Sequence, residues 1–217
     1  MKAVDTMERF RTAVAAWAAG DCSAADSAAA LAQNVHTAVL VEGASDAAAV
    51  EALAARRGMK LDAGGVATVP MGGATNIARY AGLLGPAGLG LQLTGLCDAG
   101  EERFFMRGLD RAGLGPCSTR ADLERRGFHV CVADLEDELI RALGAPAVEG
   151  IIEEHGELRT FRLFQNQPAQ RVRSVERQLR RFMGTHSGRK ISYGRFLVDG
   201  LDLARVPAPL DELVSSL

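Results

Sequence analysis

The sequence predicts an α/β fold in which a mostly parallel sheet is flanked by helices. Four short apolar segments, typical of buried strands, alternate along the chain with longer segments of helical periodicity. This alternation is typical of parallel sheets, because a helix carries the chain back to begin each new strand at the same edge. Hydrophobic residues make up 47% of the 217 residues and aromatic residues only 5%, which favours helices packed closely against a sheet.

The first 35 residues are expected to form a helical extension. Apolar residues recur at spacings of three and four through residues 4–19, which predicts an amphipathic helix. The stripe consists of Met7, Phe10, Val14 and Trp17. Gly20 ends this helix, and an alanine-rich segment that begins at Asp26 adds further helical turns.

The α/β core is expected over residues 36–146 and contains four strand–helix units. The predicted pairs are strand 37–42 with helix 45–57, strand 66–71 with helix 74–84, strand 91–97 with helix 101–113, and strand 128–133 with helix 134–143. Pro86, Gly88 and Gly90 mark the loop before the third strand.

Residues 147–217 are expected to form a helical, partly basic C-terminal region. The predicted helices are 148–154, 158–164, 169–183, 191–204 and 210–217, and a basic loop is expected over 184–190. Residues 151–195 carry ten Arg and Lys residues against four Glu, a balance of +6, so the rest of the chain sums to −8. This distribution fits a metal-dependent enzyme that acts on a polyanion, and it fits an ordinary solvated arginine-rich helix equally well.

Three of the predicted strands end in carboxylate side chains. The first ends at Glu42, beside a turn that Gly43 permits, and Asp46 follows in the first helical turn, where the helix dipole favours negative charge. The later acids are Asp98, Glu101 and Glu102 after the third strand, and Asp134, Glu136, Asp137 and Glu138 after the fourth. Each acid alone could be a helix cap, but three acidic strand ends in succession favour a shared metal site.

The remaining composition excludes several classes of protein. The four cysteines show no CxxC spacing and no paired histidines, so neither a zinc site nor a disulfide framework is expected. Residues 1–20 contain Glu8, Arg9 and Arg11 and do not resemble a signal peptide. No apolar run approaches the roughly 20 residues that a membrane span requires. We therefore expect a soluble cytoplasmic protein.

The motifs VEGASD, VPMGGATN, LTGLCDAGEE and DLEDEL follow one another in an order that resembles a Toprim domain, the metal-binding fold of topoisomerases and primases. More narrowly, the chain resembles the Toprim half of the OLD (overcoming lysogenization defect) family of nucleases, over about residues 36–205 and including the segment GRKISYGRFL. Family members are usually joined to an N-terminal ATPase domain of the ABC type. Because this chain has no room for one and no GxxxxGK motif, a stand-alone Toprim protein is expected.

The resemblance implies a role for particular residues. The metal ligands would be Glu42, Asp46, Asp98 and Glu136, with Glu42 also able to act as general acid or base. Lys190 would neutralise charge on the attacked phosphate. From the residues themselves, Glu101 is expected as a further metal ligand, since Glu101 or Glu102 could reach the site from a different direction. Position 100 departs from the family pattern, because the DxD element that starts at Asp98 has Gly100 in place of its second acid. Without the resemblance, Lys190 would be interpreted as a solvated loop cation, and its neighbour Arg189 would be equally available.

The implied function is a Mg²⁺- or Mn²⁺-dependent nuclease that hydrolyses phosphodiester bonds of DNA, because hard cations take carboxylate oxygens and two such ions cleave phosphodiesters. The residues expected to grip the nucleic-acid backbone are Arg173, Arg177, Arg180, Arg189 and Lys190. The alternative is a degenerate module that binds a protein or nucleic acid without cleaving it, as Gly100 would allow. Nucleotidyl transfer lacks a nucleotide-binding or zinc element. A separate ATPase chain is a further expected partner.

Overall fold

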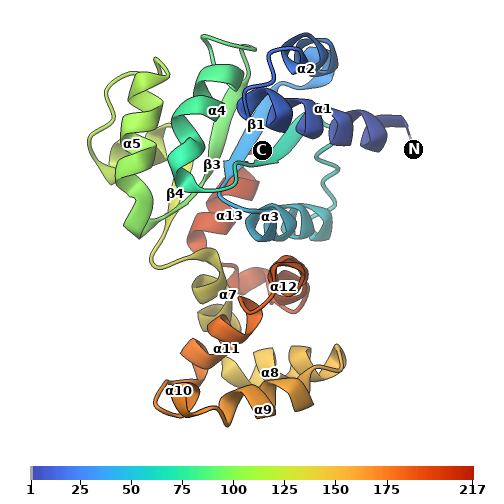
Figure 1. The fold of residues 1–217 in the computed structure, drawn as a ribbon, viewed down its shortest axis with the longest axis vertical. Coiled ribbons are helices and arrows are strands. Elements are labelled where there is room, and N and C mark those ends of the chain that lie inside the picture. Colours follow the sequence, from blue (N-terminus) through green and yellow to red (C-terminus); the bar gives the residue numbers. More distant parts are fainter. Residues whose placement is uncertain (1) are drawn as a thin grey trace.

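A four-stranded parallel sheet lies at the centre of the upper half of the molecule (Figure 1). The structure, a computed structural model, describes residues 2–217. The strands are β1 (Thr37–Val41), β2 (Val66–Pro70), β3 (Gln92–Asp98) and β4 (Phe128–Cys131). They are ordered β2-β1-β3-β4, so β1 and β3 are central and their carboxyl ends lie side by side.

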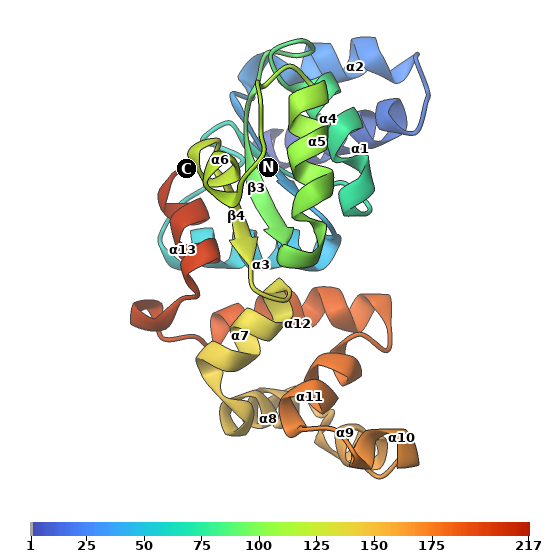
Figure 2. The ribbon, with the colours of Figure 1, turned by 90° about the vertical axis from the view of Figure 1, so that its left-hand side faces the viewer.

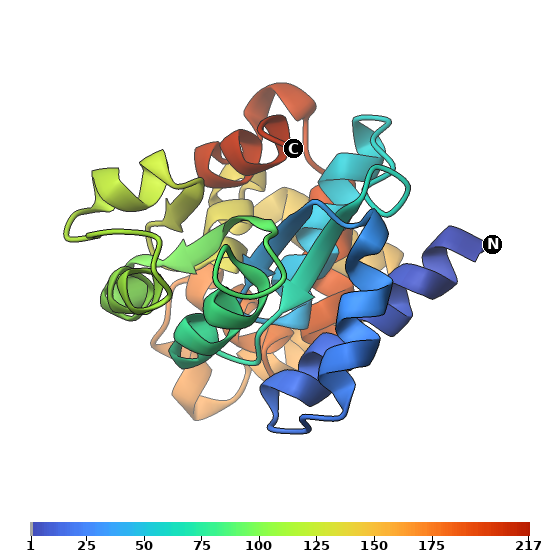
Figure 3. The same ribbon diagram turned by 90° about the horizontal axis from the view of Figure 1, so that it is seen from above.

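Side chains of the strands alternate between two apolar clusters, one on each face of the sheet. In β1, Val39 and Val41 belong to one cluster, whereas Ala38 and Leu40 belong to the other. Helices therefore cover both faces, as the view from above shows (Figure 3). Because β1 is buried on both faces, it is a continuous apolar run rather than an alternating one.

One face of the sheet is covered by helices from the first half of the chain. They are α1 (Lys2–Ala18), α2 (Ala24–Leu31), α4 (Ile77–Leu84), α5 (Glu102–Arg111) and α6 (Arg120–Arg125). The opposite face carries α3 (Ala44–Arg56) and the last helix, α13 (Ala208–Ser215). Short 3₁₀ turns are η1 (Ala32–Asn34), η2 (Ala74–Asn76), η3 (Ala99–Glu101) and η4 (Leu203–Arg205).

The remaining helices form a layer below the carboxyl edge of the sheet (Figure 2). They are α7 (Leu135–Leu143), α8 (Ala145–Glu154), α9 (Leu158–Gln165), α10 (Pro168–Arg171), α11 (Val175–Met183) and α12 (Ser187–Asp199). Their apolar side chains share one cluster with α3 and α13, so helices on both sides of residue 146 contribute to the same core.

Helix α12 packs closely against α3 through a glycine. A Cβ atom at Gly194 would overlap the carbonyl oxygen of Ser45, so only a residue without a side chain permits this approach of the two helices. The approach fixes the middle of α12 beside the first turn of α3, close to where β1 ends.

The predicted α/β class with a parallel sheet is confirmed, as are the four strand–helix units. Two predicted boundaries in the C-terminal region are wrong. The expected helix 169–183 is two helices, because Ser174 caps a new one by accepting a hydrogen bond from the backbone amide of Arg177. The expected loop 184–190 ends early, since α12 begins at Ser187. Within the residues described, no helix is long and apolar enough to cross a membrane.

Candidate metal and nucleic-acid site

Glu42 lies directly after β1, at the carboxyl edge of the sheet. The amide of Gly73 donates to the carbonyl oxygen of Glu42 over 3.0 Å and fixes the backbone there. Parallel pairing of β1 with β3 brings the Glu42 side chain to the end of β3, where the amide of Asp98 donates to Glu42 Oε1 over 3.4 Å. The two central strands thus place Glu42 and Asp98 together.

Three neighbouring acidic side chains have no basic ion-pair partner among the described side chains, and we call them the unpaired acids. They are Glu42, Asp98 and Glu101. Burial, contact with Glu101 and the charge of Asp98 together raise the pKa of Glu42 to about 8, and burial is the largest of these causes. Burial and the charges of neighbouring acids, Asp134 first, raise the pKa of Asp98 to about 7. Glu101 Oε2 is buried and has no hydrogen-bond partner. Among the side chains that the structure describes (residues 6–186 and 188–217), no Lys or Arg forms an ion pair with these three acids.

Asp46 lies in the first turn of α3, as expected from the sequence. Its Oδ2 accepts a hydrogen bond of 2.9 Å from the amide of Gly43, which closes the turn after β1. Burial and repulsion by Glu136 raise the pKa of Asp46 to about 6, while the Gly43 hydrogen bond and the charge of Lys190 oppose that rise. Asp46 therefore connects the unpaired acids with a second acidic group on α7.

The second group, Asp134 and Glu136, is paired with basic side chains from later helices. Asp134 caps α7 by accepting from the amide of Asp137 over 2.8 Å, and its other oxygen pairs with Arg180 of α11. Glu136 is only 4% exposed, and Lys190 Nζ lies 3.0 Å from its Oε1. We call Asp134 and Glu136 the paired acids.

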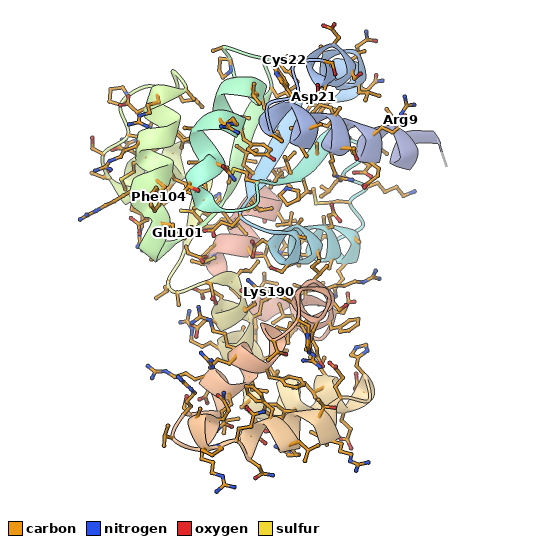
Figure 4. All side chains as sticks on the ribbon, viewed as in Figure 1. Arg9, Asp21, Cys22, Glu101, Phe104 and Lys190 are labelled. Atoms are coloured by element: carbon orange, nitrogen blue, oxygen red, sulfur yellow. The ribbon has the colours of Figure 1, made fainter. Side chains whose placement is uncertain are left out.

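Lys190 lies in the first turn of α12, at the level where the sheet meets the helical layer (Figure 4). Burial disfavours its charge, but the carboxylates of Glu136, Asp46 and Asp134 outweigh that effect, and the pKa of Lys190 is raised. The ammonium group therefore stays charged at neutral pH and faces the acids.

A cleft of about 740 Å³ opens between α7, α11 and α12. Its walls combine the two paired acids with a basic set that comprises Arg173, Arg177, Arg180, Arg181 and Lys190. Three of the arginines expected to bind nucleic acid therefore line one cleft together with Lys190. Because β4 pairs with β3 and Cys131 lies opposite Asp98, the paired acids that follow β4 lie at the same edge of the sheet as Asp98, and the cleft that they line adjoins the unpaired acids.

Arg189, the fifth residue expected to bind nucleic acid, lies elsewhere. Its guanidinium group donates to Glu157 over 2.8 Å and also donates to Thr185. It stacks on Phe182, with 4.3 Å between the guanidinium carbon and the ring centroid. These contacts hold α12 against its helical neighbours. Arg189 therefore stabilises helix packing, and Lys190, not Arg189, lines the cleft.

Sequence reasoning left Asp134 out of the expected metal ligands, whereas Arg181 was among the arginines whose helical spacing fits contact with a nucleic-acid backbone. Asp134 caps α7, and its position just after a strand could have indicated that it belongs to the site. Its ion-pair partner Arg180 is 46 positions away, so their pairing could not be expected from the sequence. Arg181 lines the cleft beside Arg180, and its helical spacing from Arg177 was visible in the sequence.

The residues of the site fit a hard divalent cation by the chemistry of their donors. Within the part of the chain that the structure describes, no three His, Cys, Asp or Glu side chains are already arranged as a metal site. The unpaired acids nevertheless offer only carboxylate oxygens, the ligands that Mg²⁺ prefers. Burial and mutual repulsion raise the pKa values of Glu42 and Asp98, and Glu101 Oε2 is buried without a hydrogen-bond partner, so a divalent cation would stabilise these carboxyl groups in their ionised form.

A parallel sheet of this order with acids at the ends of its central strands defines a Toprim-like α/β fold. Residues 35–99 match the family model of the TOPRIM domain described as overcoming lysogenization defect protein-like. Residues 35–99 are therefore an OLD-like Toprim domain, which confirms over these residues the resemblance expected from the sequence. The matched residues include Glu42, Asp46 and Asp98, and they end before Glu101.

Solved structures of OLD proteins share the fold over a longer stretch. The C-terminal region of the Xanthomonas campestris pv. campestris OLD protein is 26% identical with a TM-score of 0.64, covering 83% of this chain and 93% of that one. The C-terminal region of the Burkholderia pseudomallei OLD protein is 21% identical with a TM-score of 0.59, covering 84% of this chain and 96% of that one. No curated protein matches the sequence.

Proposed function

We propose that the protein is a divalent-metal-dependent nuclease that hydrolyses phosphodiester bonds of DNA. An OLD-like Toprim domain indicates a nuclease-type family. The observation that supports the activity most directly is the group of unpaired acids at the ends of the two central strands, in which burial and the neighbouring carboxyl groups raise the pKa of Glu42 to about 8. An arginine-lined cleft suited to a polyanion adjoins this group.

The unpaired acids Glu42, Asp98 and Glu101 would hold a Mg²⁺ or Mn²⁺ ion, and Asp46 and Glu136 would hold a second. When bound, such ions lower the pKa of water and stabilise charge on both sides of a phosphodiester. As an alternative to holding the ion, Glu42 would accept the proton of the attacking water as a general base.

The basic residues would position the substrate and stabilise its charge. Arg173 and Arg177 would contact phosphates along the cleft. Lys190 would contribute at the attacked phosphate, where a cation in a partly buried site stabilises developing negative charge. To do so, Lys190 exchanges its ion pair with Glu136 for one with the substrate, and this exchange leaves Glu136 available to a metal ion.

A plasmid-nicking assay tests this function. Supercoiled DNA is incubated with the protein and Mg²⁺ or Mn²⁺, beside the variants Glu42→Gln and Lys190→Met and the exposed control Glu154→Gln. We expect metal-dependent nicking by the wild type and the control and none by Glu42→Gln. Nicking that survives Glu42→Gln would assign the activity to another site or to a contaminant. The same assay with a structured RNA distinguishes the two nucleic acids.

A second candidate, a module that binds without cleaving, is favoured by two observations. Gly100 replaces an acid of the DxD element, and Asp134 and Glu136 are already neutralised by Arg180 and Lys190. Calorimetric titration with Mg²⁺ separates the candidates. A nuclease should bind Mg²⁺ in the wild type and lose that binding in Glu42→Gln. A module that does not cleave should bind nucleic acid without binding Mg²⁺ through Glu42. Co-elution with an ATPase from the same cells tests the expected separate partner. If the protein elutes without any ATPase at every salt concentration, that result would count against such a partner.

A further inference from the structure

Helix α5 carries three arginines that the proposed site does not use. Arg103, Arg107 and Arg111 are exposed and recur every four residues, so they form one stripe along the helix. Among the described residues these three guanidinium groups have no ion-pair or hydrogen-bond partner. Most other arginines near the sheet are engaged, as Arg120 is with Glu102. The stripe is therefore a positively charged surface that no described acidic side chain neutralises through an ion pair.

The stripe begins at the unpaired acids and extends away from the cleft. Helix α5 starts at Glu102, directly after Glu101, and α5 and α11 lie on opposite sides of the level where sheet and helical layer meet (Figures 1 and 2). Eight residues separate Arg103 from Arg111, which is about 12 Å along a helix. That length spans three or four phosphates of a strand that keeps the base-stacked rise of about 3.4 Å per phosphate, and fewer phosphates of a more extended strand.

An exposed aromatic residue accompanies the stripe. Phe104 is 46% exposed, although its neighbour Phe105 is fully buried in the core. Figure 4 labels Phe104 and Glu101 close together at the end of α5 nearest the acids. Asp110 is the one exposed acid on the same helix, and it leaves this face with a balance of +2.

We propose that α5 is a second nucleic-acid contact, in which the stripe binds backbone phosphates and Phe104 stacks on an unpaired base. Arginines that follow a backbone beside an aromatic platform fit a single-stranded polyanion, because bases stack on aromatic rings irrespective of sequence. This inference rests on the proposed nuclease function. The strand would run from the α11 cleft across the acids to α5, so that phosphates on both sides of the attacked bond are held and internal bonds are cleaved.

The test measures binding without cleavage, in the Glu42→Gln background with EDTA. Probes are fluorescein-labelled 30-nucleotide single-stranded and duplex DNA, titrated at several salt concentrations. The triple variant Arg103→Ala, Arg107→Ala, Arg111→Ala should weaken single-strand binding about 10- to 100-fold and lower the salt slope by about two. The control variant Arg9→Ala, Arg159→Ala, which removes exposed arginines away from the site, should leave both quantities unchanged.

Phe104 is tested by its effect on the two probes. Phe104→Ala should weaken single-strand binding about 5- to 100-fold and leave duplex binding within twofold, and Phe104→Trp should restore it. Thermal unfolding of each variant checks that the fold is intact, which the exposure of these side chains favours.

The outcomes distinguish this inference from the nuclease function. If the α5 variants bind like the parent while Arg177→Ala weakens binding and the wild type still nicks plasmid, the α5 contact is refuted and the nuclease stands. If Phe104→Ala weakens both probes equally, base stacking is refuted. Absence of both binding and nicking in the parent proteins would overturn the two proposals together.

Discussion

Replacing Glu42 by glutamine should make the metal-free protein more stable while it removes metal binding. The folded protein holds the Glu42 proton more tightly than the unfolded chain, since the pKa rises from 4.5 to about 8. Stability from this group is therefore complete below about pH 4.5 and is lost as the pH rises to about 8. Glu42→Gln removes the charge and with it this loss.

The magnitude follows from the same pKa. A rise to about 8 would correspond to at most about 5 kcal/mol, because a tenfold change in the ionisation constant is about 1.4 kcal/mol. Glu42 is only half-buried, so solvent screening reduces this figure to about 1–3 kcal/mol. For a chain of 217 residues, that corresponds to an increase in Tm of about 2–10 °C.

The assay is thermal unfolding followed by circular dichroism, in EDTA at pH 5 and at pH 8. We expect Glu42→Gln to exceed the wild type at pH 8 and nearly to match it at pH 5, and the exposed control Glu154→Gln to show no difference at either pH. With 10 mM Mg²⁺ at pH 8, a wild-type Kd near 1 mM would add about 1.4 kcal/mol, which Glu42→Gln should not gain. Equal Tm values for wild type and Glu42→Gln in EDTA at pH 8 would refute the reasoning.

Three further predictions concern Lys190, Gly100 and Gly194. Lys190→Met should lower the single-turnover rate of cleavage about 10²- to 10³-fold, whereas Arg189→Met should mainly lower the Tm; the reverse pattern would exchange their roles. Gly100→Asp, whose Cβ would meet open space, should tighten Mg²⁺ binding about tenfold in calorimetry at pH 7.5, and unchanged affinity would place position 100 outside coordination reach. Gly194→Ala should lower the urea-unfolding free energy by about 1–3 kcal/mol through overlap with Ser45, unlike the uncrowded Gly184→Ala; an unaltered free energy would contradict the close packing of α12 on α3.

The sheet and its acidic edge could be predicted from the sequence because both depend on local pattern. A strand buried on both faces is a short continuous apolar run, as β1 is, and an acid at its end is placed by chain order alone. Glu42 and Asp98 therefore follow from two strand ends and the rule that parallel strands share an edge. The sequence does not show which strands are neighbours; the pairing of β1 with β3 in the structure does.

The environment of Arg189 and Lys190 could not be predicted in the same way. In the expected loop, the two cations were equally available to the site. In a helix, consecutive side chains point about 100° apart, so Lys190 reaches Glu136 while Arg189 reaches Glu157. The helix itself was obscured by Gly188 and Gly194. At Gly194 the low helix propensity is offset by close packing against Ser45 of α3. A tertiary contact therefore determines which of two neighbouring cations enters the cleft.

The division of the acids into paired and unpaired groups constrains the order of events at the site. The unpaired acids repel one another when they are ionised, which raises the pKa values of Glu42 and Asp98, so a divalent ion that stabilises the ionised form gains most by binding there first. The paired acids already have Arg180 and Lys190 as counter-ions, and a metal that binds Glu136 must compete with the Lys190 ammonium group. A phosphate in the cleft removes that competition, because it offers Lys190 another anion. Substrate and the second metal ion should therefore bind cooperatively, each strengthening the binding of the other by the same factor.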